Sequence, residues 1–133
     1  MIYLFDTFFF FLKTKKYRCT FFFTFHRGSF NSQEGSAECS KCSVGRSSTT
    51  MARTAACDAC TKGTYQTKEG MTACLKCIPG RYQTQENQSE CIDCGVGKAS
   101  SIVGRENDCD SCSEGQHQSK QGTTACLNCI PGK

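Results

Sequence analysis

The chain has 133 residues, of which 38% are hydrophobic, and that figure includes thirteen cysteines. Nine of the ten phenylalanines lie within the first 25 residues, so the remainder is too polar to offset an ordering entropy of roughly 1–2 kcal/mol per residue by burial alone. The formal net charge is +4, but from residue 19 onward twelve basic and eleven acidic residues are well mixed. No basic face or stripe is visible, so nucleic-acid binding has no electrostatic support.

Residues 1–24 differ in composition from the rest of the chain. Two phenylalanine runs, Phe8–Phe11 and Phe21–Phe23, flank a patch of lysines. The first run is far shorter than the about 20 apolar residues of a transmembrane helix, and no small-residue cleavage site follows it. We interpret the segment either as a gene-model artefact, because a pyrimidine-rich tract before a splice site would encode phenylalanines, or as a poorly formed targeting segment.

Residues 25–133 are a tandem repeat of C-x-x-C pairs about 17 residues apart. Phe25 stands where a cysteine would open the first loop. Each later loop of 13 or 14 residues has Gly three positions after its opening cysteine. We expect the array to be truncated at its C-terminus, because the sequence ends within a repeat. The pairs are Cys39/Cys42, Cys57/Cys60, Cys74/Cys77, Cys91/Cys94, Cys109/Cys112 and Cys126/Cys129.

The loops are of two kinds. The aromatic units have a ring five residues after the opening position and Gly or Asn ten residues after it; the Val-Gly units lack the ring and read Val-Gly-Arg or Val-Gly-Lys. Gly28–Gly80 aligns with Gly80–Gly132 without a gap, and about half of the positions are identical. Such duplication predicts a linear array in which each unit contacts mainly its neighbours. The rings are Phe30, Tyr65, Tyr82 and His117.

The fold class follows from what is missing. No stretch after residue 25 keeps helical periodicity, and glycines and two prolines punctuate the chain. We predict a small disulfide-rich protein: an elongated tandem array of short β-hairpin and turn modules with little regular secondary structure and no large hydrophobic core. The second glycine of the aromatic loops, replaced once by Asn87, indicates a residue with positive φ.

The cysteines are compatible with three chemistries. Disulfides across loops of this length would contribute roughly 3 kcal/mol each and indicate an oxidising compartment. Zinc is the alternative, because C-x-x-C pairs at this separation approach ribbon spacing, although six equivalent pairs in tandem are unusual for ribbons. Thiol redox catalysis needs an activated C-x-x-C in a βαβ setting, which is absent. We favour disulfides.

The stretches Cys77-Ile-Pro-Gly-Arg-Tyr82 to Cys91 and Cys60-Thr-Lys-Gly-Thr-Tyr65 to Cys74 resemble the ephrin type-A/B receptor-like repeat of the growth-factor-receptor cysteine-rich superfamily. They are also similar to the first module of tumour-necrosis-factor-receptor repeats. The resemblance covers residues 28–132, and it implies an extracellular protein whose ligand the repeat class does not specify.

The receptor-module similarity implies a disulfide ladder in which each loop closes on itself. A crossed scheme, joining first to first and second to second cysteines of neighbouring pairs, stays open. Under the ladder the pairing of Cys19, Cys39 and Cys129 is uncertain: Cys39 loses its partner to Phe25 unless Cys19 replaces it, and Cys129 needs a cysteine further on. The ladder pairs are Cys42–Cys57, Cys60–Cys74, Cys77–Cys91, Cys94–Cys109 and Cys112–Cys126.

These features lead us to expect an extracellular or cell-surface ectodomain that acts as a spacer, an adhesion module or a protein- or glycan-binding module. We expect a monomeric rod with no enzymatic activity, no cofactor, no bound metal and no nucleic-acid partner, and membrane contact only through a part of the protein outside this sequence. The alternative is an intracellular zinc-ribbon array binding protein or nucleic acid. Asn87-Gln88-Ser89 is a glycosylation sequon.

Overall fold

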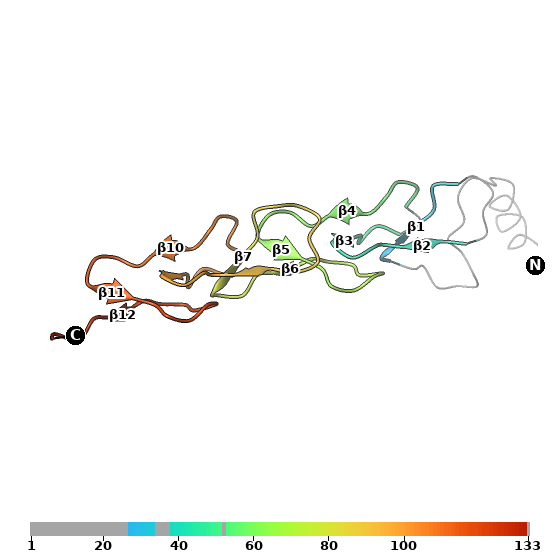
Figure 1. The fold of residues 1–133 in the computed structure, drawn as a ribbon. Helices are drawn as coiled ribbons and strands as arrows, with labels where there is room; N and C mark the ends of the chain where they lie inside the picture. Colours follow the sequence, from blue (N-terminus) through green and yellow to red (C-terminus); the bar gives the residue numbers. More distant parts are fainter. Residues whose placement is uncertain (1–26, 34–37, 52, 133) are drawn as a thin grey trace, which may run out of the picture.

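The computed structural model describes residues 27–33, 38–51 and 53–132, so the interpretation of residues 1–24 and the roles of Cys19 and Phe25 lie outside the described residues. Within this part the chain forms six two-stranded antiparallel sheets and no helix. The hairpins follow one another along a long, narrow molecule, from β1 and β2 near one end to β11 and β12 near the other (Figure 1). The predicted fold class is confirmed.

Every strand is two residues long, and each hairpin pairs the two residues after a loop's first glycine with the two middle residues of the next C-x-x-C pair. The strands are β1 (Ser29–Phe30), β2 (Ser40–Lys41), β3 (Arg46–Ser47), β4 (Asp58–Ala59), β5 (Thr64–Tyr65), β6 (Leu75–Lys76), β7 (Arg81–Tyr82), β8 (Ile92–Asp93), β9 (Lys98–Ala99), β10 (Asp110–Ser111), β11 (Gln116–His117) and β12 (Leu127–Asn128).

The chain enters each hairpin through a tight turn. In the unit that opens at Cys77, the N–H of Arg81 donates to the Ile78 carbonyl at 3.1 Å, and Gly80 has a φ of 84°. Proline at the second position and a positive φ at the third are the pattern of a type II turn. The predicted positive φ at the second glycine position is also confirmed. Asn87 has a φ of 61°, and the glycines at the equivalent positions have positive φ values too.

Five disulfides close the loops on themselves, with Cα–Cα distances of 5.5 to 5.8 Å, inside the range that a disulfide requires. These are the bonds of the ladder, and the crossed scheme is wrong. Cys39 is also disulfide-bonded, so it is not left unpaired. Cys129 carries an exposed free thiol. The bonds are Cys42–Cys57, Cys60–Cys74, Cys77–Cys91, Cys94–Cys109 and Cys112–Cys126.

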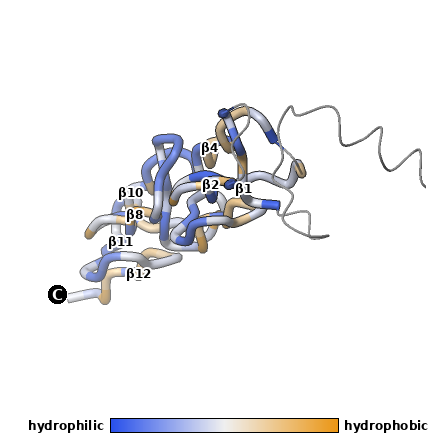
Figure 2. Tube along the Cα trace, turned by 90° about the vertical axis from the view of Figure 1, so that its right-hand side faces the viewer, coloured by the Kyte–Doolittle hydropathy of each residue, from blue (hydrophilic) through white to orange (hydrophobic). Residues whose placement is uncertain are grey.

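The interior consists of sulfur and polar side chains. Among the described residues the buried hydrophobic positions are six cysteines and Ala99, whereas Leu75, Ile78 and Ile92 are about half exposed. Figure 2 shows short hydrophobic segments spread along the trace between hydrophilic ones. The disulfides therefore replace the apolar core that the composition could not supply.

Neighbouring units are joined by backbone hydrogen bonds. We call the glycine three positions after the opening cysteine the first-turn glycine, and the residue ten positions after that cysteine the second-turn residue. Each of the four junctions between units 42–57 and 112–126 has the same three bonds. The N–H groups of the first-turn glycine and of the residue three positions after it donate to the next unit, and the N–H of the second-turn residue donates to the previous unit. At the junction between units 77–91 and 94–109 they run from Gly80 N–H to Ser100 O (2.7 Å), from Gln83 N–H to Arg105 O (3.0 Å) and from Gly104 N–H to Cys77 O (2.7 Å).

Contacts also reach the second neighbour, which extends the predicted nearest-neighbour array. A β-carbon placed on Gly80 would lie 2.2 Å from the carbonyl oxygen of Gly122, two units further along. Gly63 lies equally close to Gly104. Backbone thus meets backbone where a side chain cannot fit, and each first-turn glycine from 28 to 80 contacts a unit that is not its immediate neighbour.

Candidate functional site

The position three residues after the first glycine holds a buried polar side chain in every unit of the described part. In the aromatic unit 77–91 it is Gln83, which is 4% exposed. Its side-chain amide donates to the Glu90 carbonyl at 2.8 Å, and its amide oxygen accepts from the N–H of Gln85 at 3.0 Å. Gln66 and Gln118 make the same two bonds. The glutamine fastens the carbonyl before the closing cysteine to the start of the loop.

The Val-Gly units meet the same requirement with two residues. Ser100 replaces the glutamine and accepts from the N–H of Ile102 at 3.2 Å, as the glutamine oxygen would. Arg105 then supplies the donors: its Nε and Nη2 donate to the Asp108 carbonyl, the one before Cys109, at 2.9 and 2.6 Å. Arg53 does the same for the Ala56 carbonyl at 2.8 Å.

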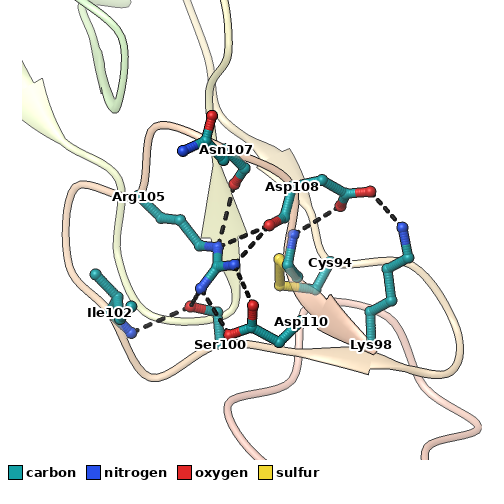
Figure 3. A network of polar contacts seen from close by, with 9 residues as sticks. Cys94, Lys98, Ser100, Ile102, Arg105, Asn107, Asp108 and Asp110 are labelled. Atoms are coloured by element: carbon teal, nitrogen blue, oxygen red, sulfur yellow. Dashed lines mark hydrogen bonds and ion pairs between the residues drawn. A yellow bond between two sulfur atoms is a disulfide. The ribbon is translucent and has the colours of Figure 1, made fainter. Parts of the chain in front are cut away.

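Figure 3 shows how the Arg105 guanidinium is used. Besides the Asp108 carbonyl it donates to both carboxylate oxygens of Asp110, at 2.9 and 2.6 Å, and to the Ser100 hydroxyl at 3.2 Å. The side chain is 11% exposed, so the charge is held largely out of water by ligands from its own loop. Beside it, Lys98 pairs with the Asp108 carboxylate.

The ion pairs shift the acid groups in one direction. The hydrogen bond from Arg105 lowers the pKa of Asp110 below its ordinary value. The hydrogen bond from Lys98 is the largest cause of the lowered pKa of Asp108, and the Tyr82 hydroxyl adds to it. Both carboxylates therefore stay ionised at neutral pH, which suits structural ion pairs rather than a proton donor.

The rings identified in the sequence lie on the hairpins. Tyr82 is opposite Ile92, and Tyr65 is opposite Leu75. Residues directly opposite in an antiparallel pair lie on one face, so these two hairpins each carry a ring beside an aliphatic side chain. Phe30, in contrast, is opposite Ser40. His117 is opposite Leu127 and also lies 3.9 Å, through Nδ1, from the Cys129 sulfur.

The described residues offer no metal centre, since no three His, Cys, Asp or Glu side chains gather there. Ten of the cysteines that a zinc array would need are joined in disulfides. A shallow depression of about 390 Å³ lies over Ile102, Arg105 and Asn107. Nothing in the described part of the chain forms a helix able to cross a lipid bilayer.

Sequence reasoning missed the buried clamp of Gln83 and Arg105. The signal was present in units 42–57 to 112–126. Glutamine or serine recurs three residues after the first glycine, and in the two units with serine an arginine follows five residues later. However, a polar residue at a regular spacing is normally interpreted as solvent-exposed, unless the carbonyl with which it forms a hydrogen bond is known.

The fold and the ladder define a class: a disulfide-linked array of cysteine-rich hairpin units. Residues 49–80 match the family described as tyrosine-protein kinase ephrin type A/B receptor-like. No curated protein matches the chain. The chain therefore contains a cysteine-rich ephrin-receptor-like repeat, and the family and the disulfides are consistent with an extracellular repeat region.

Proposed function

We propose that the array is a stiff, non-enzymatic spacer in the ectodomain of a secreted or surface protein. The observation that carries the proposal is the repeated junction. Each first-turn glycine from Gly28 to Gly97 donates to the next unit, and from Gly28 to Gly80 it also lies against the backbone of the unit after that. A hinge needs a junction with few contacts, and the four fully described junctions are alike.

A non-enzymatic role agrees with the state of the charged groups. Arg105 is occupied by carbonyls and Asp110, and the carboxylates beside it have lowered pKa values. Catalysis needs a group free to bind or to exchange a proton inside a concave site. The depression near Arg105 is shallow and open to solvent, and the guanidinium that lines it is already hydrogen-bonded.

The test uses the 52-residue period as a ruler. Excising residues 46–97 joins Gly45 to Lys98, and because these positions repeat, the new junction is one that the chain already makes. We expect small-angle scattering on the oxidised full-length chain and on the shortened chain to give maximum dimensions that differ by the length of three units. The difference cancels whatever lies outside the repeats.

The same data give the absolute shape. A compact domain of the 105 residues from 28 to 132 would have a radius of gyration of about 13 Å. A spacer must exceed this clearly. A maximum dimension that barely changes on excision, or a radius near the compact value, would rule out the spacer.

A further inference from the structure

Asn87 is the non-glycine residue with a positive φ in the described part of the chain, and its main chain is fixed on the inner side. Its N–H donates to the Cys60 carbonyl at 2.8 Å. Its carbonyl oxygen lies 2.5 Å from where a β-carbon on Gly45 would be, so it faces the unit two places earlier. The backbone of this turn is therefore buried in the junctions.

Asn87 is nevertheless accessible to solvent. The residue is exposed, and within the described part of the chain its amide has no hydrogen-bond partner. Ser89, two residues further on, is also exposed. The turn therefore presents an asparagine amide and a serine hydroxyl at the spacing of an N-linked acceptor, on a backbone that does not need the amide for its own hydrogen bonds.

We propose that Asn87 carries an N-linked oligosaccharide. The donor is an oligosaccharide joined through its anomeric carbon to a lipid diphosphate. The Asn87 Nδ2 forms a bond to that carbon, the bond from the carbon to the diphosphate oxygen breaks, the lipid diphosphate leaves, and Nδ2 loses one proton. The modification rests on the proposed function in that it requires passage through a secretory compartment.

The neighbouring units show why the turn tolerates a branched modification. Gly70 occupies the equivalent position with a φ of 69°, and a β-carbon there would be in ordinary contact, 3.5 Å, with the Lys41 side chain. Gly70 is followed two residues later by Thr72, so only the asparagine is missing from an acceptor. A side chain at this turn position therefore has room beside the flexible Lys41 stem, and at position 87 the chain places an exposed asparagine there.

The test expresses the full chain behind a cleavable secretion leader in eukaryotic cells. The leader directs the chain into the secretory pathway, so this experiment tests glycosylation of Asn87 independently of where the natural protein is located. The location of the natural protein is tested separately, by localising the chain without the added leader. We expect the secreted, oxidised protein to lose one glycan's mass on treatment with an N-glycosidase, with Asn87 converted to aspartate in the peptide spanning residues 82–91.

Asn87→Gly should abolish the shift while keeping the left-handed turn and the disulfides, and Ser89→Ala should abolish it with the asparagine still present. Gly70→Asn should add a second glycan. An unmodified Asn87 in the secreted, oxidised wild type would overturn the proposal, as would a glycan that persists in Asn87→Gly.

Discussion

The smallest features that decide this structure are single residues at sterically closed positions. Gly80 combines a positive φ with a backbone neighbour, the Gly122 carbonyl, where a side chain would be. Gly97 has a similar φ of 76° but nothing within 4 Å of a β-carbon. Substitutions at the two positions therefore distinguish the energetic cost of a left-handed backbone from the cost of a steric clash with the neighbouring backbone.

We expect Gly97→Ala to lower the free energy of unfolding by about 1–2 kcal/mol, the cost of a left-handed L-residue. Gly80→Ala should add a further steric cost of about 1–3 kcal/mol, because neither backbone can yield without moving a unit. Thermal unfolding of the oxidised chain, followed by circular dichroism, measures both. Equal losses for the two variants would mean that the second-neighbour contact contributes nothing.

The charged residues give a prediction about pH. Arg105 lowers the pKa of Asp110 by hydrogen bonding, so the folded pKa lies below the unfolded value of about 3.9. The pair's contribution to stability is present above the unfolded pKa and is lost as the pH falls through the folded pKa.

In Arg105→Gln we expect a carboxyl NMR titration to show the pKa of Asp110 raised toward its ordinary value. Asp58 is the internal control, because Arg53 lowers its pKa in the other Val-Gly unit and stays in place. A pKa of Asp110 that does not move would show that Arg105 is not its partner in solution.

At the scale of the element, each of the five loops from 42–57 to 112–126 has a side-chain donor to the carbonyl before its closing cysteine. Gln83 supplies it in an aromatic unit and Arg105 in a Val-Gly unit. The hairpins have only two residues in each strand, too few to be stable alone. The clamp and the disulfide together hold the loop in the shape that the junctions need.

Gln83→Met keeps the side chain's size but leaves the Glu90 carbonyl and the Gln85 N–H without their partner. We expect a loss of about 0.5–1.5 kcal/mol for each hydrogen bond that the substitution removes. Gln121→Met is the matched control, because Gln121 is exposed. The comparison is again thermal unfolding of the oxidised chain, and similar midpoints for the two variants would contradict a structural role for the clamp.

At the scale of the whole molecule, covalent bonds stand in for a core. Reduction of the oxidised full-length chain should abolish the structure, because each loop loses a cross-link worth roughly 3 kcal/mol and little apolar area remains to compensate. Circular dichroism and proteolysis detect the change. EDTA should have no effect, and a chain with free thiols that collapses on chelation would require the zinc alternative after all.

How far the sequence alone reaches differs between these scales. The spacing of the cysteines and glycines determined the fold class, the positive φ at Asn87 and the hairpin array, because these are local consequences of covalent geometry and chain composition. The ladder needed a resemblance as well, since spacing alone leaves the pairing open.

Only the tertiary structure decided which groups lie inside. The burial of Gln83 and the substitution of its amide by the Arg105 guanidinium depend on how each loop folds back on itself. The contact between Gly80 and Gly122 depends on residues far apart in the chain meeting between units. Local sequence specifies each unit, but which carbonyl needs a side-chain donor becomes visible only once the loop has folded around it.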